Sequence, residues 1–221
     1  MYAILIVCSP CVAFTSCDNE DDFVSQSENV SAETNDVQKI REMFESKNFQ
    51  SLDEAAAYAD SIIKTVEPIT RALNEDDYLE NSLSPEALSV IEQMKNLKVD
   101  GDCSIESLRT ILKEIVHNSN LLENSHEYNI LLYSIDTAIE VIYYVQEIQA
   151  ANELSPVTRF SINWDKVTQV VRCVGGTVGA AGLGAISGAT VGTVTLPIIG
   201  TVSGTSLGCW CGAMTGAATF C

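Results

Sequence analysis

The stretch CVGGTVGAAGLGAISGATVGTVTLPIIGTVSGTSLGCWCGAMTGAATFC, residues 173–221, decides the fold of this chain. It contains no charged residue, and its glycines keep one four-residue repeat that only Ala180 and Leu196 interrupt. The glycines of this repeat are Gly176, Gly184, Gly188, Gly192, Gly200, Gly204, Gly208, Gly212 and Gly216. Each glycine costs a water-exposed helix about 1 kcal/mol relative to alanine, so the repeat requires a compensating contact. Residues four apart lie on one helix face, where glycine lets two backbones pack closely.

Pro197 divides this stretch near its midpoint and predicts an antiparallel helical hairpin. The helices are expected near residues 174–195 and 198–220, joined by an apolar turn. Each helix would be about 34 Å long at the helical rise of 1.5 Å per residue. Because the hydrocarbon core of a bilayer is about 30 Å thick, a hairpin of this length fits a membrane.

The hairpin also predicts how the cysteines of the tail are paired. An antiparallel arrangement brings Cys173 opposite Cys221, where a disulfide would close the open end of the hairpin. Cys209 and Cys211 point apart on a helix and are not expected to bond each other. The C-x-x-C pair Cys8–Cys11 lies in the apolar N-terminal segment, and no Cys/His cluster accompanies it, so we expect no metal site.

The N-terminus has the features of an export signal. Residues 2–14 are mostly apolar and uncharged, and they are too few to span a bilayer. Small residues precede Cys17, and the acidic run DNEDD follows it. This pattern resembles the lipobox of bacterial lipoproteins and the export tag of Bacteroidota surface lipoproteins. The resemblance implies a signal peptide over residues 1–17, lipidation of Cys17 and anchoring in the cell envelope, at the outer membrane or cell surface. A polar tether is expected over residues 18–35; the alternative is a buried apolar N-terminal segment.

The middle of the chain, residues 36–153, predicts a small acidic helical bundle. The formal net charge of the protein is −18, and only one acidic residue, Asp165, follows Leu154. Such an acidic body argues against a nucleic-acid partner, because phosphates would be repelled. Apolar residues recur at helical spacing, and no β-hairpin signal interrupts them. The expected helix starts are Asn35, Ser51, Ser84, Ser104 and Ser125. The fold class is therefore all-α, with this bundle followed by the glycine-zipper hairpin.

The bundle shows no catalytic motif. His117 and His126 are the only histidines, and each is expected near a helix end. No nucleophile elbow, zinc-protease motif or phosphate-binding loop is present. Because acidic residues in such numbers usually form solvated helix faces, we expect no enzyme activity, no catalytic residue and no cofactor.

An amphipathic connector, residues 154–172, precedes the hairpin at residues 173–221. Trp164 beside Lys166 and Arg172 is typical of a membrane–water boundary. The alternative is a linker helix that docks on the bundle.

The tail resembles the glycine-zipper bacteriocins, small antibacterial peptides that insert into membranes, and also halocin-type bacteriocin domains. The resemblance rests on glycine spacing and composition over about a quarter of the chain. It implies a lipid membrane as partner, with self-association through the hairpin and an immunity or masking partner. The leading hypothesis is an exported lipoprotein whose hairpin inserts into membranes, with the bundle masking the hairpin or conferring immunity. Two alternatives are a non-toxic envelope lipoprotein that uses the hairpin for anchoring or oligomerisation, and a soluble binding module with the hairpin as its core.

Overall fold

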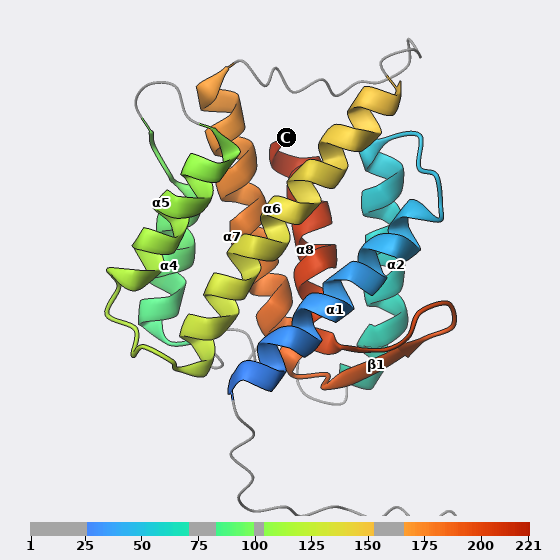
Figure 1. Cartoon of the computed structure of the whole chain (residues 1–221), viewed down its shortest axis with the longest axis horizontal. Coiled ribbons are helices and arrows are strands. Elements are labelled where there is room, and N and C mark those ends of the chain that lie inside the picture. Colours follow the sequence, from blue (N-terminus) through green and yellow to red (C-terminus); the bar gives the residue numbers. More distant parts are fainter. Residues whose placement is uncertain (1–25, 71–82, 100–103, 153–165) are drawn as a thin grey trace, which may run out of the picture.

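The computed structural model describes residues 26–70, 83–99, 104–152 and 166–221, which form seven helices and one short β-hairpin (Figure 1). The helices are α1 (Gln26–Glu45), α2 (Leu52–Thr70), α4 (Pro85–Lys95), α5 (Ile105–His117), α6 (His126–Asn152), α7 (Val167–Ala189) and α8 (Gly204–Phe220). The strands are β1 (Thr193–Leu196) and β2 (Gly200–Ser203). The predicted all-α class is confirmed, because the two strands are the smallest part of the fold.

Four of the helices begin where a serine was expected to cap them. The Oγ of Ser84 accepts a hydrogen bond from the Ala87 backbone N–H at 3.1 Å, and Pro85 follows it at the first helical position. Ser104 and Ser125 accept equivalent bonds at the starts of α5 and α6. At Ser51 the cap is reciprocal: Ser51 accepts from the Glu54 N–H, while the Glu54 carboxylate accepts from the Gln50 N–H.

Two boundaries differ from the sequence expectation. Helix α1 begins at Gln26, inside the segment predicted as a polar tether, because residues 26–35 contain neither glycine nor proline to stop it. Helix α2 continues to Thr70 although Pro68 was expected to kink or end it.

The glycine-rich tail lies at the centre of the molecule. Helices α7 and α8 run side by side through the middle of Figure 1, with α1 and α2 on one side and α4 and α5 on the other. Helix α6 crosses in front and contacts both hairpin helices. The segments predicted as separate domains, the acidic bundle and the hairpin, therefore share one hydrophobic core.

The turn of the hairpin is not the apolar helix–helix turn that was predicted. Helix α7 ends at Ala189, and an antiparallel ribbon pairs Thr193 with Ser203 and Leu196 with Gly200 before α8 begins. Gly192 and Gly200 have φ angles of +75° and +77°, which other residues rarely adopt. Three residues, 197–199, connect the strands, and a glycine in the left-handed region after such a loop is a common hairpin geometry. The correct helix ends are therefore Ala189 and Gly204.

Candidate functional site: a covered glycine-zipper hairpin

Glycine removes the side chains where α7 crosses α8. A Cβ added to Gly184 would overlap the carbonyl oxygen of Gly208 and lie 3.1 Å from the Cα of Gly212. A Cβ added to Gly188 would overlap the carbonyl oxygen of Gly204, and the reverse also holds. The two backbones are therefore in direct contact, which only glycine permits.

The contact continues toward the open end of the hairpin. There a Cβ on Gly212 would lie 2.5 Å from the carbonyl oxygen of Ala180, and one on Gly216 would lie 2.6 Å from the Ala180 Cβ. Gly176 lies against the ring of Phe220. Seven of the nine glycines assigned to helix packing thus lie between the helices.

The other two glycines of the repeat have a different role. Gly192 directly precedes β1 and Gly200 begins β2, and at both positions an added Cβ would meet nothing within 4 Å. Their assignment to helix packing is therefore wrong: backbone conformation, rather than close approach, requires glycine at both positions.

The helices α1, α2, α4, α5 and α6, which contact the hairpin, are called the cover. A second face of α7 without side chains packs against this cover, and the sequence did not lead us to predict it. A Cβ on Gly175 would overlap the carbonyl oxygen of Met94 in α4, and one on Gly179 would lie 2.5 Å from the Cγ of Lys95. The signal was present, because Gly175 and Gly179 also lie four residues apart. Helix α7 thus presents glycines to both α8 and α4, so its backbone can approach both helices closely.

The open end of the hairpin carries the predicted disulfide. Cys173 and Cys221 are bonded, with their Cα atoms 4.4 Å apart, across 48 residues of chain. Closure of a loop of this length is expected to stabilise the fold by about 4 kcal/mol, chiefly through the unfolded chain. Cys209 and Cys211 are free thiols buried in α8.

An aromatic cluster joins the hairpin to its cover. Trp210 of α8 is fully buried, with its ring centroid 5.8 Å from that of Phe44 in α1 and 6.1 Å from that of Tyr144 in α6. Burial, followed by the nearby Glu45 carboxylate, raises the pKa of Tyr144 to about 12. Within the described ranges the Nε1 of Trp210 has no hydrogen-bond partner. A buried N–H without an acceptor costs about 1–3 kcal/mol. The contact between Trp210 and the covering helices is therefore less stable than one in which this N–H is hydrogen-bonded.

Polar groups hold the start of α8. The Asp36 carboxylate of α1 accepts a hydrogen bond from the Ser203 N–H at 2.8 Å. The Ser203 Oγ caps α8 by accepting from the Ser206 N–H, and the Tyr133 hydroxyl of α6 donates to the Ser206 Oγ at 2.6 Å. The covering helices α1 and α6 are thereby tied to the ribbon end of the hairpin.

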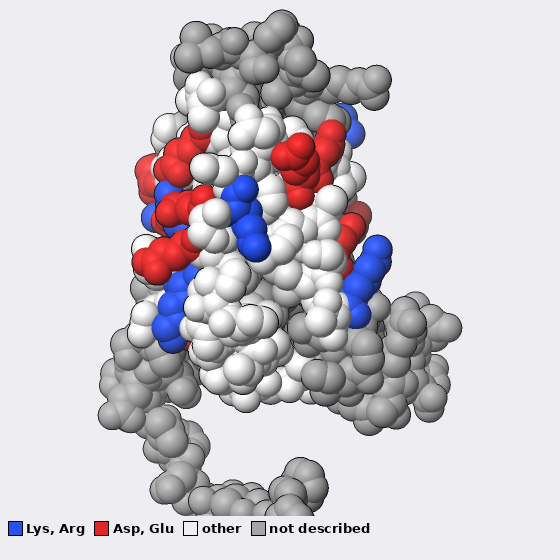
Figure 2. All heavy atoms as spheres, turned by 90° about the vertical axis from the view of Figure 1, so that its right-hand side faces the viewer, with Lys and Arg blue, Asp and Glu red and all other residues white. Residues whose placement is uncertain are grey.

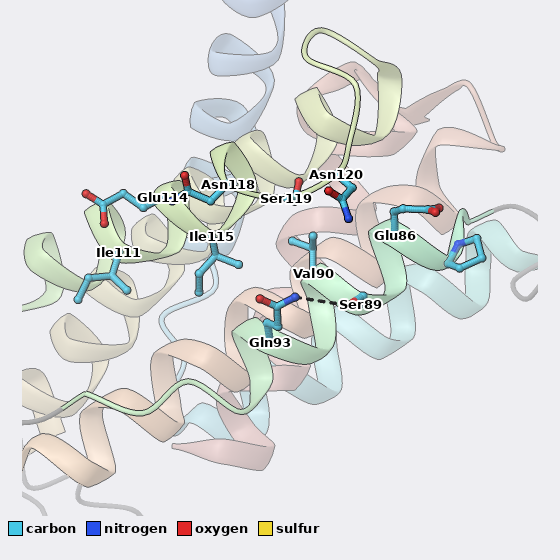
Figure 3. A pocket seen from close by; sticks show the side chains of 11 residues that line it. Glu86, Ser89, Val90, Gln93, Ile111, Glu114, Ile115, Asn118, Ser119 and Asn120 are labelled. Atoms are coloured by element: carbon cyan, nitrogen blue, oxygen red, sulfur yellow. Dashed lines mark hydrogen bonds between the residues drawn. The ribbon is translucent and has the colours of Figure 1, made fainter.

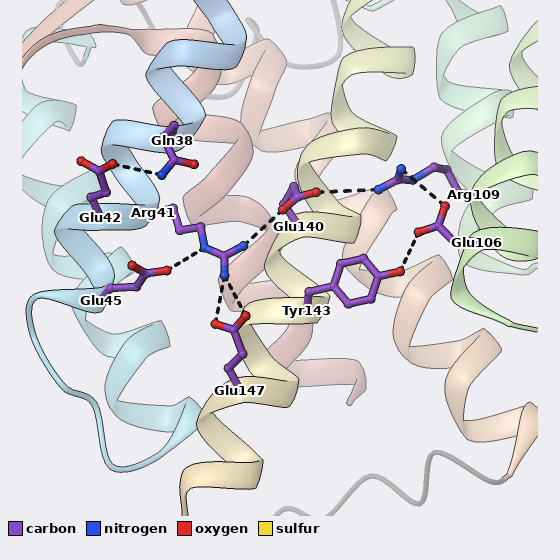
Figure 4. Close-up of polar contacts among 9 residues, drawn as sticks. All are labelled: Gln38, Arg41, Glu42, Glu45, Glu106, Arg109, Glu140, Tyr143 and Glu147. Atoms are coloured by element: carbon purple, nitrogen blue, oxygen red, sulfur yellow. Dashed lines mark hydrogen bonds and ion pairs between the residues drawn. The ribbon is translucent and has the colours of Figure 1, made fainter.

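Ion pairs connect the covering helices α1 and α5 to α6 (Figure 4). Arg41 of α1 binds Glu147 at 2.8 Å and Glu140 at 3.2 Å, both on α6. On the other side, Lys113 of α5 binds Asp136 of α6 at 2.8 Å. Although burial lowers the pKa of Arg41, hydrogen bonds to Glu45 and Glu147 outweigh it and raise that pKa overall. The glutamates are about half exposed, so each pair contributes only about 0–1 kcal/mol.

The remaining predicted residues lie away from this contact. Cys17 and Trp164 lie outside the described residues. Lys166 is exposed at the N-cap of α7, and Arg172 is exposed six residues further on, just before the disulfide-bonded Cys173. Helix α7 is thus continuous from the predicted connector into the hairpin, and its two cations lie at the disulfide end.

A groove of about 540 Å³ lies between α4 and α5 (Figure 3). Its walls mix carboxylates and amides with apolar side chains, and Gln93 donates a hydrogen bond to Ser89 at 3.3 Å. Among the described side chains no group of three His, Cys, Asp or Glu could hold a metal ion.

One helix in the described part of the chain, α7, is long and apolar enough to cross a bilayer. In the most apolar stretch of this helix, 72% of the residues are buried inside the protein. Core helices of water-soluble proteins also have these properties, so the length and composition of α7 leave both environments open. Comparison of the chain with known protein families, curated proteins and solved structures gives no match.

Proposed function

We propose that this protein is an exported, lipid-anchored envelope protein that stores a bacteriocin-like, membrane-inserting hairpin in covered form. The observation that carries the proposal is the position of the uncharged stretch 173–221: α7 and α8 lie at the centre, and neither helix contains an acidic residue. An uncharged helix pair with backbone-to-backbone contact is suited to lipid, where each polar backbone group must be satisfied within the element.

The hairpin keeps its own contacts independently of the cover. Its glycine interface and its disulfide lie within residues 173–221, so both can persist when the covering helices move away. The contacts that hold the cover are, by comparison, apolar packing, hydrogen bonds from Ser203 to Asp36 and from Tyr133 to Ser206, and weak ion pairs on α6. A bilayer can replace the apolar packing that the hairpin loses on release.

A charge placed on an exposed part of α7 tests the proposal without disturbing the water-soluble fold. Ser187 is exposed near the ribbon end of α7, within the segment that would enter the bilayer. Thr168 is exposed at the opposite end of the same helix, beside Lys166. We therefore compare Ser187→Lys with the matched control Thr168→Lys. If the ribbon end of the hairpin enters the bilayer first, a lysine at residue 187 has to pass through the hydrocarbon core, where it costs about 3 kcal/mol, whereas a lysine at residue 168 stays near the surface.

Release of trapped dye from liposomes is the measurement. Wild-type protein and Thr168→Lys should release dye, while Ser187→Lys should release it at least about tenfold more slowly, with unchanged circular dichroism in water. Equal release by the two lysine variants would show that this part of α7 does not enter the bilayer. Complete absence of release by the wild-type protein, tested also at acidic pH, would remove the proposal.

The burial of the hairpin favours one other function. Trp210 is fully enclosed, and most of α7 is covered, as expected for a soluble binding module in which the hairpin is the core. This alternative predicts that the wild-type protein and both lysine variants leave liposomes intact under every condition.

A further inference from the structure

The β-ribbon and its loop, residues 193–203, form a surface that we call the tip. Its inner side is fixed to the core, because Val194 and Val202 are buried. Its end projects: Pro197 is exposed, and Ile198 is 61% exposed. An isoleucine this accessible contributes little to the core, and together with the exposed Pro197 it makes the end of the tip apolar.

The tip is uncharged in a strongly acidic protein. No charged residue lies between Cys173 and Cys221, whereas the whole chain has a net charge of −18. Figure 2 shows acidic and basic side chains on the upper and middle parts of one face, and an uncharged bulge at its lower centre, where the ribbon lies. A basic or acidic protein partner therefore finds no complementary charge on the tip itself.

The two strands of the tip are paired with each other. Four residue pairs form the ribbon, from Thr193–Ser203 to Leu196–Gly200. On its exposed side the Thr195 and Thr201 hydroxyls hydrogen-bond to each other at 3.0 Å. Only the backbone groups that face the partner strand are thus paired, and those on the outer edges need water or lipid headgroups as partners. The end of the ribbon is therefore suited to the headgroup–acyl boundary rather than to the hydrocarbon core.

The position of the tip favours a flat partner over a groove-forming one. The tip lies at the end of the molecule opposite the disulfide, and the α5–α6 connection reaches the same end (Figure 1). That connection carries Leu122, which is 80% exposed. Two separate apolar projections at one end are suited to a lipid surface, whose apolar interior lies beneath a broad interface.

We propose that the tip is the surface through which this protein first contacts a lipid bilayer, with Ile198 and Pro197 entering the headgroup–acyl boundary while the acidic helices stay in water. This inference rests on the proposed function and adds to it an order and a direction: the tip enters first, and the disulfide end of the hairpin stays outside. Repulsion between the acidic helices and anionic lipids would further orient the uncharged tip toward the membrane.

The test compares two variants of equal charge in the full chain. Ile198→Asp places a carboxylate on the tip, and Leu88→Asp places one on α4, at a leucine that is 40% exposed. Both also carry Cys17→Ser, so that lipid on that residue cannot attach the protein. Flotation with phosphatidylcholine vesicles measures binding, and circular dichroism in water verifies the fold of each variant.

The Cys17→Ser parent and the Leu88→Asp variant should float with the vesicles, while Ile198→Asp should bind at least about tenfold more weakly. Leu122→Asp should weaken binding to a smaller degree. Binding of Ile198→Asp equal to that of Leu88→Asp would overturn the inference, and so would a parent protein that does not float. The latter result is the one expected if the tip instead contacts another protein.

Dye release separates this inference from the function on which it rests. Release that is unaffected by Ile198→Asp would leave the inserting hairpin in place and remove the tip as the contact surface. Ile198-dependent binding without release, in contrast, would keep the contact surface and remove insertion of the hairpin.

Discussion

Two glycines of α7, only two residues apart, should respond in opposite ways to the same substitution. Gly184 faces α8, and a Cβ there would overlap the carbonyl oxygen of Gly208. Gly182 faces the side chains of Leu131 and Ile91, and a Cβ there would lie 3.4 Å from the nearest atom, an ordinary contact distance. Alanine substitutions at the two positions therefore measure how much the close backbone contact contributes to the free energy of unfolding.

The magnitudes follow from two opposing effects. Alanine is favoured over glycine within a helix by about 1 kcal/mol. Gly182→Ala has room for its methyl group, so it should raise the free energy of unfolding by about 0.5–1 kcal/mol. At Gly184 the overlapping atom belongs to a backbone that cannot rotate away, and overpacking costs about 1–3 kcal/mol. Because the overlap is with backbone, we take the upper end of this cost, about 3 kcal/mol. After the helix preference of about 1 kcal/mol is subtracted, Gly184→Ala should lower the free energy of unfolding by about 2 kcal/mol.

Urea unfolding followed by far-ultraviolet circular dichroism measures both values. The slope of the free energy against urea should stay constant, so that a shifted midpoint reports a change in stability. If Gly184→Ala were as stable as the wild-type protein, close backbone contact would not be the reason for glycine there. If Gly182→Ala destabilised the fold as much as Gly184→Ala, any side chain on α7 would be harmful, and the direction of each glycine would be irrelevant.

Three further predictions concern the closure, the cover and the pH dependence of the fold. Reduction of Cys173–Cys221 should lower the free energy of unfolding by about 4 kcal/mol, measured by urea unfolding with and without a reductant; an unchanged midpoint would contradict the closed hairpin. Asp36→Ala should cost about 1–3 kcal/mol, because it leaves the Ser203 N–H without its acceptor, and amide hydrogen exchange at Ser203 should accelerate. The raised pKa of Tyr144, about 12 against an ordinary value of 10.0, means that the folded state holds this proton more tightly than the unfolded state. Stability should therefore fall as the pH rises from about 10 to 12, and Tyr144→Phe should remove part of that fall.

The hairpin could be predicted because its determinants are local and periodic. The spacing of Gly184, Gly188, Gly208 and Gly212 specifies which face of each helix is bare, and an antiparallel return of the chain brings Cys173 to Cys221. Serine caps likewise depend on neighbouring residues only, so the starts of α4, α5 and α6 were correct.

The ribbon was missed because two periods overlap in the same sequence. Gly192 and Gly200 keep the four-residue phase of the zipper, yet they lie between residues of strong β preference, TVTL and TVS. The alternation of exposed threonine with buried Val194 and Val202 is the signal that would have identified the strands. Because helix packing and a tight turn both favour glycine, spacing alone cannot distinguish these two requirements.

The central position of the hairpin depends on long-range packing, which no local pattern contains. Helix α2 carries buried alanines and contacts α8, which lies far from it in the sequence. In the same way, Gly175 matters because the Met94 carbonyl of a distant helix approaches it. Such pairings appear only when the whole chain is assembled.

The division of the contacts bears on how a covered hairpin can serve a membrane. Glycine contacts and the disulfide lie within the hairpin, so they need not be broken when the hairpin leaves its cover. The Phe44–Trp210 packing and the Asp36–Ser203 bond cross from cover to hairpin, so their free energy is lost when the hairpin leaves. Release is thus decided by the second group alone, against the apolar burial that lipid supplies. Stable contacts within the hairpin and weaker contacts between cover and hairpin are therefore compatible, because release of the hairpin breaks only the second kind.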